Sequence, residues 1–93
     1  YTIDFTIDVE QVTMIGELTT VFSQIMTIEA NQVSIQNIHF TGTAHMLTNG
    51  EIDGFEFKNN TVDVTSTATF MTLETTNNIN MESLNINFFK HTL

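Results

Sequence analysis

The feature of this sequence that most constrains its fold is a short strand unit that recurs along the chain. Residues 25–29 (Ile-Met-Thr-Ile-Glu) recur as residues 70–74 (Phe-Met-Thr-Leu-Glu), an offset of 45 residues. Residues 34–40 recur as residues 83–88 with one residue deleted. Self-similarity at a fixed period is typical of repeat architectures. We therefore interpret residues 1–93 as a single domain made of two imperfect repeats of about 45 residues.

A spacing of three apolar residues, at positions i, i+3 and i+5, divides each repeat again. The four sets are Val9, Val12, Met14; Ile35, Ile38, Phe40; Ile52, Phe55, Phe57; and Met81, Leu84, Ile86, and their starts are 26, 17 and 29 residues apart. Ile7-Asp8 also recurs as Ile52-Asp53, again 45 residues on. The spacing predicts about four coils. The residues expected to be buried are Ile35, Ile38, Phe40, Ile52, Phe55, Phe57, Leu84, Ile86 and Phe88.

The start of the chain alternates between apolar and polar residues. The apolar members are Tyr1, Ile3, Phe5, Ile7 and Val9. A period of two predicts a strand with one buried face over residues 1–10. Residues 17–30 contain apolar spacings of three and four that would also fit a helix, but their threonines and β-branched residues disfavour one. The expected fold class is all-β.

Three segments, residues 33–42, 52–62 and 82–88, resemble coils of the right-handed parallel β-helix proteins, the pectin-lyase-like group. The resemblance implies a parallel β-helix of about four coils, with alternate apolar side chains stacked inside. It also implies asparagine ladders at the turns, for which the candidates are Asn37, Asn59, Asn60 and Asn85. The alternative is a duplicated antiparallel β-sandwich or barrel, which explains the 45-residue period equally well and leaves no open coil ends.

The charge balance excludes two classes of partner. Eleven carboxylates face only Lys58 and Lys90, there is no arginine, and the net charge is −9. Nucleic acids and anionic membrane surfaces both require several lysines or arginines, so neither is expected to bind. No apolar run approaches the length of a bilayer-spanning helix, so membrane insertion is not expected. A first residue other than methionine fits a processed secreted protein or a fragment of a longer chain, and we expect an extracellular or cell-surface location.

Catalytic residues are hard to find in this sequence. The lyases of the family that it resembles use an arginine base and clustered calcium-binding aspartates, and this chain has no arginine and no adjacent aspartates. It has no cysteine and no Gly-x-Ser-x-Gly motif. Glycoside hydrolysis needs two carboxylates, and the candidates are Asp4, Asp8, Asp53 and Asp63. Solvated charges on strand faces account for these four more simply, so we expect no enzyme.

Metal sites are also not predicted. The histidines, His39, His45 and His91, are spaced 6 and 46 residues apart, unlike the ligands of zinc sites. Calcium remains an alternative because it binds clustered carboxylates, and the candidates are Asp8, Glu10, Glu51, Asp53 and Glu56. No calcium-binding loop motif accompanies them. The expected cofactor is therefore none.

The sequence favours a structural or adhesive module that self-assembles or forms part of a longer solenoid or filament. Proteins usually block exposed strand edges with lysine or proline, and this chain has two lysines and no proline. The expected assembly strand consists of Tyr1, Ile3, Phe5, Ile7 and Val9. Asn59 begins an Asn-x-Thr glycosylation pattern. The alternative function is a soluble binding module for a small apolar ligand or a glycan.

Overall fold

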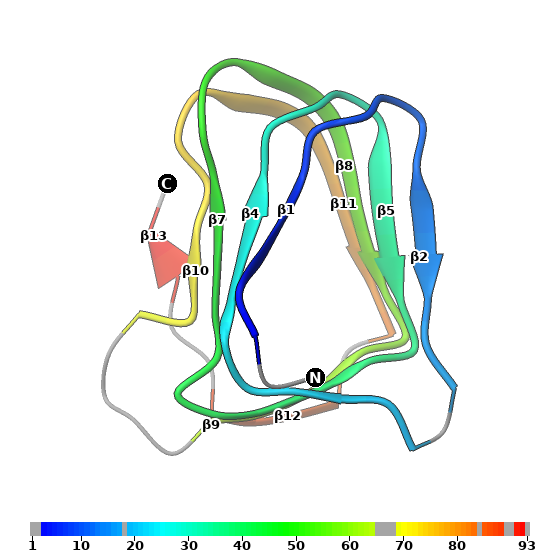
Figure 1. The fold of residues 1–93 in the computed structure, drawn as a ribbon, viewed down its shortest axis with the longest axis vertical. Helices are drawn as coiled ribbons and strands as arrows, with labels where there is room; N and C mark the ends of the chain where they lie inside the picture. Colours follow the sequence, from blue (N-terminus) through cyan, green and yellow to red (C-terminus); the bar gives the residue numbers. More distant parts are fainter. Residues whose placement is uncertain (1–2, 18, 65–68, 84, 89–90, 93) are drawn as a thin grey trace.

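The described part of the chain folds entirely into strands. The computed structural model describes residues 3–17, 19–64, 69–83, 85–88 and 91–92. The strands in these residues are β1 (Phe5–Ile7), β2 (Thr13–Ile15), β3 (Val21–Phe22), β4 (Ile25–Ile28), β5 (Val33–Gln36), β6 (His39–Gly42), β7 (His45–Thr48), β8 (Ile52–Lys58), β9 (Thr61–Val64), β10 (Met71–Thr72), β11 (Thr76–Glu82), β12 (Asn85–Phe88) and β13 (His91–Thr92). Figure 1 shows them wound in successive coils.

Each sheet takes every third strand. Sheet A has the order β1-β4-β7-β10-β13, sheet B the order β11-β8-β5-β2 and sheet C the order β12-β9-β6-β3. The pairs within all three sheets are parallel. The fold is therefore an all-parallel β-solenoid, and the antiparallel sandwich or barrel is wrong. Sheets of four and five strands agree with the expected number of about four coils.

The strand register supports one of the sequence equivalences. Met26 pairs with Met46, and Met46 pairs with Met71. Residues 25–29 and 70–74 therefore occupy matching positions in sheet A, two coils apart. This is the placement that the 45-residue offset between them predicts.

A second equivalence is wrong. Ile7 pairs with Ile28 in sheet A, whereas Ile52 pairs with Thr76 in sheet B. Ile7-Asp8 and Ile52-Asp53 thus lie on different walls of the solenoid. Two-residue matches arise easily by chance in a chain of alternating strands, and this one carries no structural relation.

The fourfold apolar spacing is correct in pairs but shifted between them. Met14 pairs with Ile35, Ile35 with Phe57, and Phe57 with Met81. Ile35 and Met81 begin their sets, whereas Met14 and Phe57 end theirs. Alternate coils therefore carry the same spacing at different places around the coil.

The core is a column of inward side chains, rich in phenylalanine. The predicted residues Ile35, Ile38, Phe40, Ile52, Phe55 and Phe57 are all buried, which confirms that part of the prediction. Leu84, Ile86 and Phe88 lie outside the side chains that the structure describes. Ring centroids are 5.8 Å apart for Phe22 and Phe40 and 5.4 Å apart for Phe40 and Phe57, distances typical of favourable aromatic pairs.

The initial segment does not form the long strand expected over residues 1–10. Of the assembly-strand residues, Phe5 and Ile7 lie in the three-residue strand β1 and pack against the core, whereas Ile3 and Val9 lie outside it. Tyr1 falls outside the described residues. The strand ends early because a coil with three walls must turn every few residues, and the chain turns before Gln11, whose φ is 60°.

The corners on either side of the sheet B strands are built from residues with positive φ. One column contains Gln11, Gln32, Gly54 and Asn78, and a second contains Asn37, Asn59 and Ser83. The strand register aligns the members of each column from coil to coil. Glycine and asparagine tolerate this conformation best.

The expected asparagine ladder is present only in part. Asn37 and Asn59 occupy matching corners in successive coils. Asn60 is buried, its Oδ1 accepting a hydrogen bond from Ile38 N (3.0 Å) and its Nδ2 donating to Ile35 O (2.9 Å) in the preceding coil. The backbone of Asn85 pairs with Thr61 and not with an asparagine, so its place in the ladder is wrong.

Candidate functional site

Exposed apolar side chains gather on the first coil, β1 to β3. The large hydrophobic residues that are exposed in the described chain are Ile3, Val9, Ile15, Val21 and Ile25, with exposed fractions of 40–69%. The first four belong to the first coil, and Ile25 begins the next one. Exposed apolar residues grouped in this way mark interaction surfaces more often than scattered ones do.

The register explains why the first coil is exposed. Val9 aligns with Ala30 and Ile52 in the following coils, which are 6% and 2% exposed, yet Val9 is 61% exposed. Met14 is likewise half-buried although Phe57 in the same column is fully buried. These inward side chains have a neighbouring coil on one side only.

Three open sheet edges meet at the same end of the molecule. β1, β2 and β3 each stand last in the order of their sheet. Their inner edges are paired, as shown by the bonds that Glu29 N donates to Ile7 O and that Gly16 N donates to Gln36 O. An open strand edge is a template for pairing with another strand. We call β1 to β3, with their exposed side chains, the open end.

A polar groove lies on the outer face of sheet B. It has a volume of about 300 Å³ and is lined by the side chains of Thr13, Gln32, Ser34, Glu56, Asn78 and Asn80. Four of these form one outward row, because Thr13 pairs with Ser34, Ser34 with Glu56 and Glu56 with Asn80. The groove therefore runs across β2, β5, β8 and β11.

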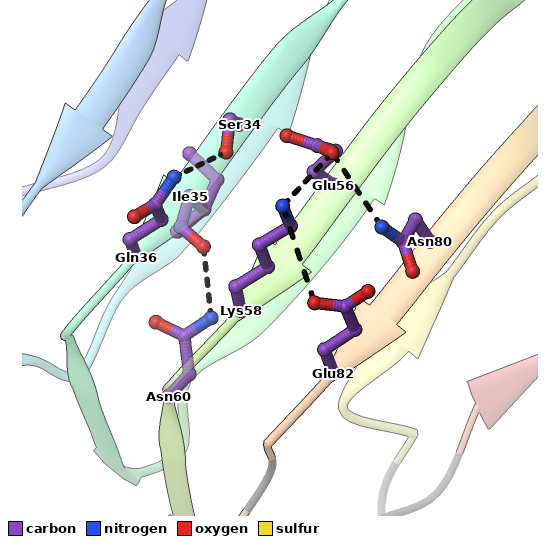
Figure 2. A network of polar contacts seen from close by, with 8 residues as sticks. All are labelled: Ser34, Ile35, Gln36, Glu56, Lys58, Asn60, Asn80 and Glu82. Carbon is purple, nitrogen blue, oxygen red and sulfur yellow. Dashed lines mark hydrogen bonds and ion pairs between the residues drawn. The ribbon is translucent and has the colours of Figure 1, made fainter.

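An ion-pair network borders this groove (Figure 2). Lys58 Nζ lies 3.2 Å from Glu56 Oε2 and 4.0 Å from Glu82 Oε2, and Asn80 Nδ2 donates to Glu56 Oε2 at 3.5 Å. The hydrogen bond from Lys58 lowers the pKa of the Glu56 carboxyl below its ordinary value, with partial desolvation acting in the opposite direction. The groove thus holds one ionised carboxylate, and the nearby lysine is already shared between two carboxylates.

A second hollow, of about 280 Å³, lies at the corner between sheets B and C. Glu17, Asn37, His39, Asn59 and Thr61 line it. The Nε2 atom of His39 is buried without a hydrogen-bond partner. His39 as a whole is only partly buried, so the sequence expectation that it points outward is right for the residue but not for this atom.

The structure brings few of the residues considered for metal binding together. No group of three or more histidine, aspartate or glutamate side chains in the described part of the chain could hold an ion. His45 Nε2 lies 3.2 Å from Thr72 Oγ1, and nothing is described of the His91 side chain. Asp53 accepts a hydrogen bond from Asn78 Nδ2 and Asp4 accepts one from Ile25 N, which are structural contacts.

The glycosylation candidate, Asn59, is exposed at its corner with a φ of 54°. Its modification stays a prediction. Sequence reasoning missed the groove, although the alternating polar residues of β5, β8 and β11 signalled it. The shifted register between coils concealed which of those polar residues share a row.

No protein-family model, curated protein or solved structure matches this chain. Within the described residues no helix could cross a membrane. The open end and the groove therefore have to be interpreted from their own chemistry.

Proposed function

We propose that this chain is a structural β-solenoid module of an extracellular or cell-surface assembly, and that its open end stacks on another copy of the chain. The observation that carries the proposal is the exposure of inward side chains on the first coil. Val9 is 61% exposed where its counterparts in the next two coils are at most 6% exposed. A further coil over β1 to β3 would bury them.

A second copy suits this surface because the solenoid already repeats the required contact. Each described coil pairs in parallel with the next, at offsets of 21 residues between Met14 and Ile35 and 22 between Ile35 and Phe57. Stacking one end of a copy on the opposite end of another is a heterologous contact. Such a contact generates a filament when its rotation does not close a ring.

Charge sets the conditions for this assembly. A net charge of −9 on each copy makes like-charge repulsion oppose stacking. Salt screens charges over about 8 Å at physiological ionic strength. Assembly should therefore increase as salt is added, which is the opposite of what an assembly held by surface ion pairs would do.

The relation to the right-handed, pectin-lyase-like proteins belongs to the same proposal. The stacked parallel coils, the inward phenylalanine column and the asparagine corners support it. No catalytic role accompanies it, because the proposed contact is made by apolar side chains and strand edges.

Sedimentation velocity and negative-stain electron microscopy test the proposal directly. The chain should be monomeric when dilute in low salt and should form rods of increasing length as its concentration and the salt concentration rise. A monodisperse monomer at high concentration and high salt would remove the structural function. A soluble binding module would then be the better interpretation.

A further inference from the structure

From the groove on sheet B we infer that the chain binds a neutral polysaccharide, one segment of which lies across β2, β5, β8 and β11. This inference does not depend on the stacking proposal, since the groove faces outward from sheet B and lies away from the contact between coils. Its volume of about 300 Å³ is at the lower end of the range for small-molecule sites. Such a groove accommodates part of an extended chain.

The lining groups have the chemistry of sugar recognition. Thr13 and Ser34 offer hydroxyls, and Gln32, Asn78 and Asn80 offer amides. Hydroxyls and amides both donate and accept hydrogen bonds, as the neighbouring hydroxyls of a sugar ring require. These groups recur from strand to strand at a spacing of about 4.8 Å, which matches a ligand that is itself a repeating chain.

The electrostatics select against anionic ligands. Glu56 is the one charged side chain lining the groove, and the hydrogen bond from Lys58 favours its ionised form by lowering its pKa. Lys58 is held between Glu56 and Glu82. A uronate, sulfate or phosphate group would meet a carboxylate without a cation to offset it, whereas uncharged hydroxyls can donate to that carboxylate.

Hydrogen bonds hold the groove in a defined shape. Gln11 Nε2 donates to Gln32 Oε1 at 2.9 Å, which orients the Gln32 amide and leaves its Nε2 outside that bond. Asn78 Nδ2 donates to Asp53 Oδ1, leaving the Asn78 Oδ1 outside that bond. Side chains ordered before binding lose less entropy when a ligand arrives.

Gly54 keeps the groove open between these two amides. Its φ is +84°, and a Cβ at this position would approach Gln32 Cγ to 3.2 Å. Glycine therefore serves both the corner conformation and the space above it.

Isothermal titration calorimetry with defined hexasaccharides tests the inference. The probes are cellohexaose, mannohexaose and galactohexaose as neutral chains, with hexagalacturonate as the anionic comparison. At least one neutral hexamer should bind and hexagalacturonate should not. Absence of heat with all three neutral hexamers at millimolar concentration, or preferential binding of hexagalacturonate, would overturn the inference.

Two variants and a matched control locate the binding. Gln32→Ala combined with Asn80→Ala should weaken neutral-hexamer binding by about tenfold or more, because each removes an amide from the groove. Asn49→Ala, which removes an exposed amide outside the groove, should leave binding unchanged. Equal loss in both proteins would place the ligand elsewhere and contradict the inference.

Glu56→Gln separates hydrogen bonding from charge. Because glutamine still accepts a hydrogen bond, the variant should keep most of the neutral-hexamer affinity and bind hexagalacturonate better than the original protein does. Complete loss of neutral-hexamer binding in Glu56→Gln, with its unfolding midpoint unchanged, would show that the ligand is cationic and not neutral.

Discussion

The first coil and the second and third coils share one register but differ in how completely they bury the same positions. Val9, Ala30 and Ile52 occupy one column, and their exposed fractions are 61%, 6% and 2%. The difference does not come from polarity, since all three residues are apolar. It comes from the number of neighbouring coils.

The same comparison on the outer face of sheet B gives a second contrast. Glu56 and Lys58 form an ion pair in the third coil, and the residues that align with them in the first coil are Thr13 and Ile15. The first coil is thus less charged where the later coils carry charge. Fewer charges and more exposed apolar area are the properties of a surface meant to be covered.

Truncation of inward side chains should show the largest difference between the coils. Phe57→Ala should cost roughly 3 to 5 kcal/mol by leaving a cavity in the column, whereas Met14→Ala should cost about 1 to 2 kcal/mol because Met14 is already half-exposed. Urea unfolding of dilute protein measures both. Similar costs would mean that the first coil is as enclosed as the third, contrary to the register comparison.

Loss of a corner asparagine should have an intermediate effect. Asn60→Ala leaves Ile38 N and Ile35 O without the partners that now join two coils, which should cost about 2 to 3 kcal/mol. Asn49→Ala removes an exposed amide that donates to Glu29, and should change stability by less than about 0.5 kcal/mol. The pair of unfolding curves would coincide if the corner bonds contributed nothing.

The ion pair of the third coil should have the smallest effect. Lys58→Met should raise the pKa of Glu56 toward the ordinary glutamate value of about 4.3, as followed by a carboxyl NMR titration. The folded-state pKa is lowered, so any stabilisation by the pair is present above the unfolded pKa and is lost as pH falls through the lowered value. The effect should be small because the pair is partly exposed to solvent. A Glu56 pKa that does not respond to Lys58→Met would show that the pair does not form in solution.

Much of the fold could be predicted because burial leaves a local pattern. Alternation in residues such as Val33 to Gln36 and Thr61 to Val64 identified strands, and the repeated spacing indicated coils. Which strands are neighbours could not be read as well. Coil length varies from 18 residues between Phe22 and Phe40 to 25 between Met46 and Met71, so a fixed period slips out of register.

The site was less predictable for a related reason. Thr13, Ser34, Glu56 and Asn80 are unremarkable polar residues in the sequence, and only the register places them in one row. The long initial strand failed as a prediction because alternation does not reveal a corner. Gln11 adopts a positive φ without being glycine or asparagine, so residue type did not mark the turn.

The central claim, that the open end is covered by another copy, is tested most directly by placing one lysine there and the same lysine elsewhere. Val9→Lys puts the charge on the open end, and Thr43→Lys puts it in an exposed turn of the second coil. Both changes make the net charge less negative by one unit, and both should leave the unfolding midpoint of the monomer nearly unchanged. In sedimentation velocity at high salt, Thr43→Lys should assemble like the original chain and Val9→Lys should remain a monomer. Equal assembly of the two variants would contradict the account.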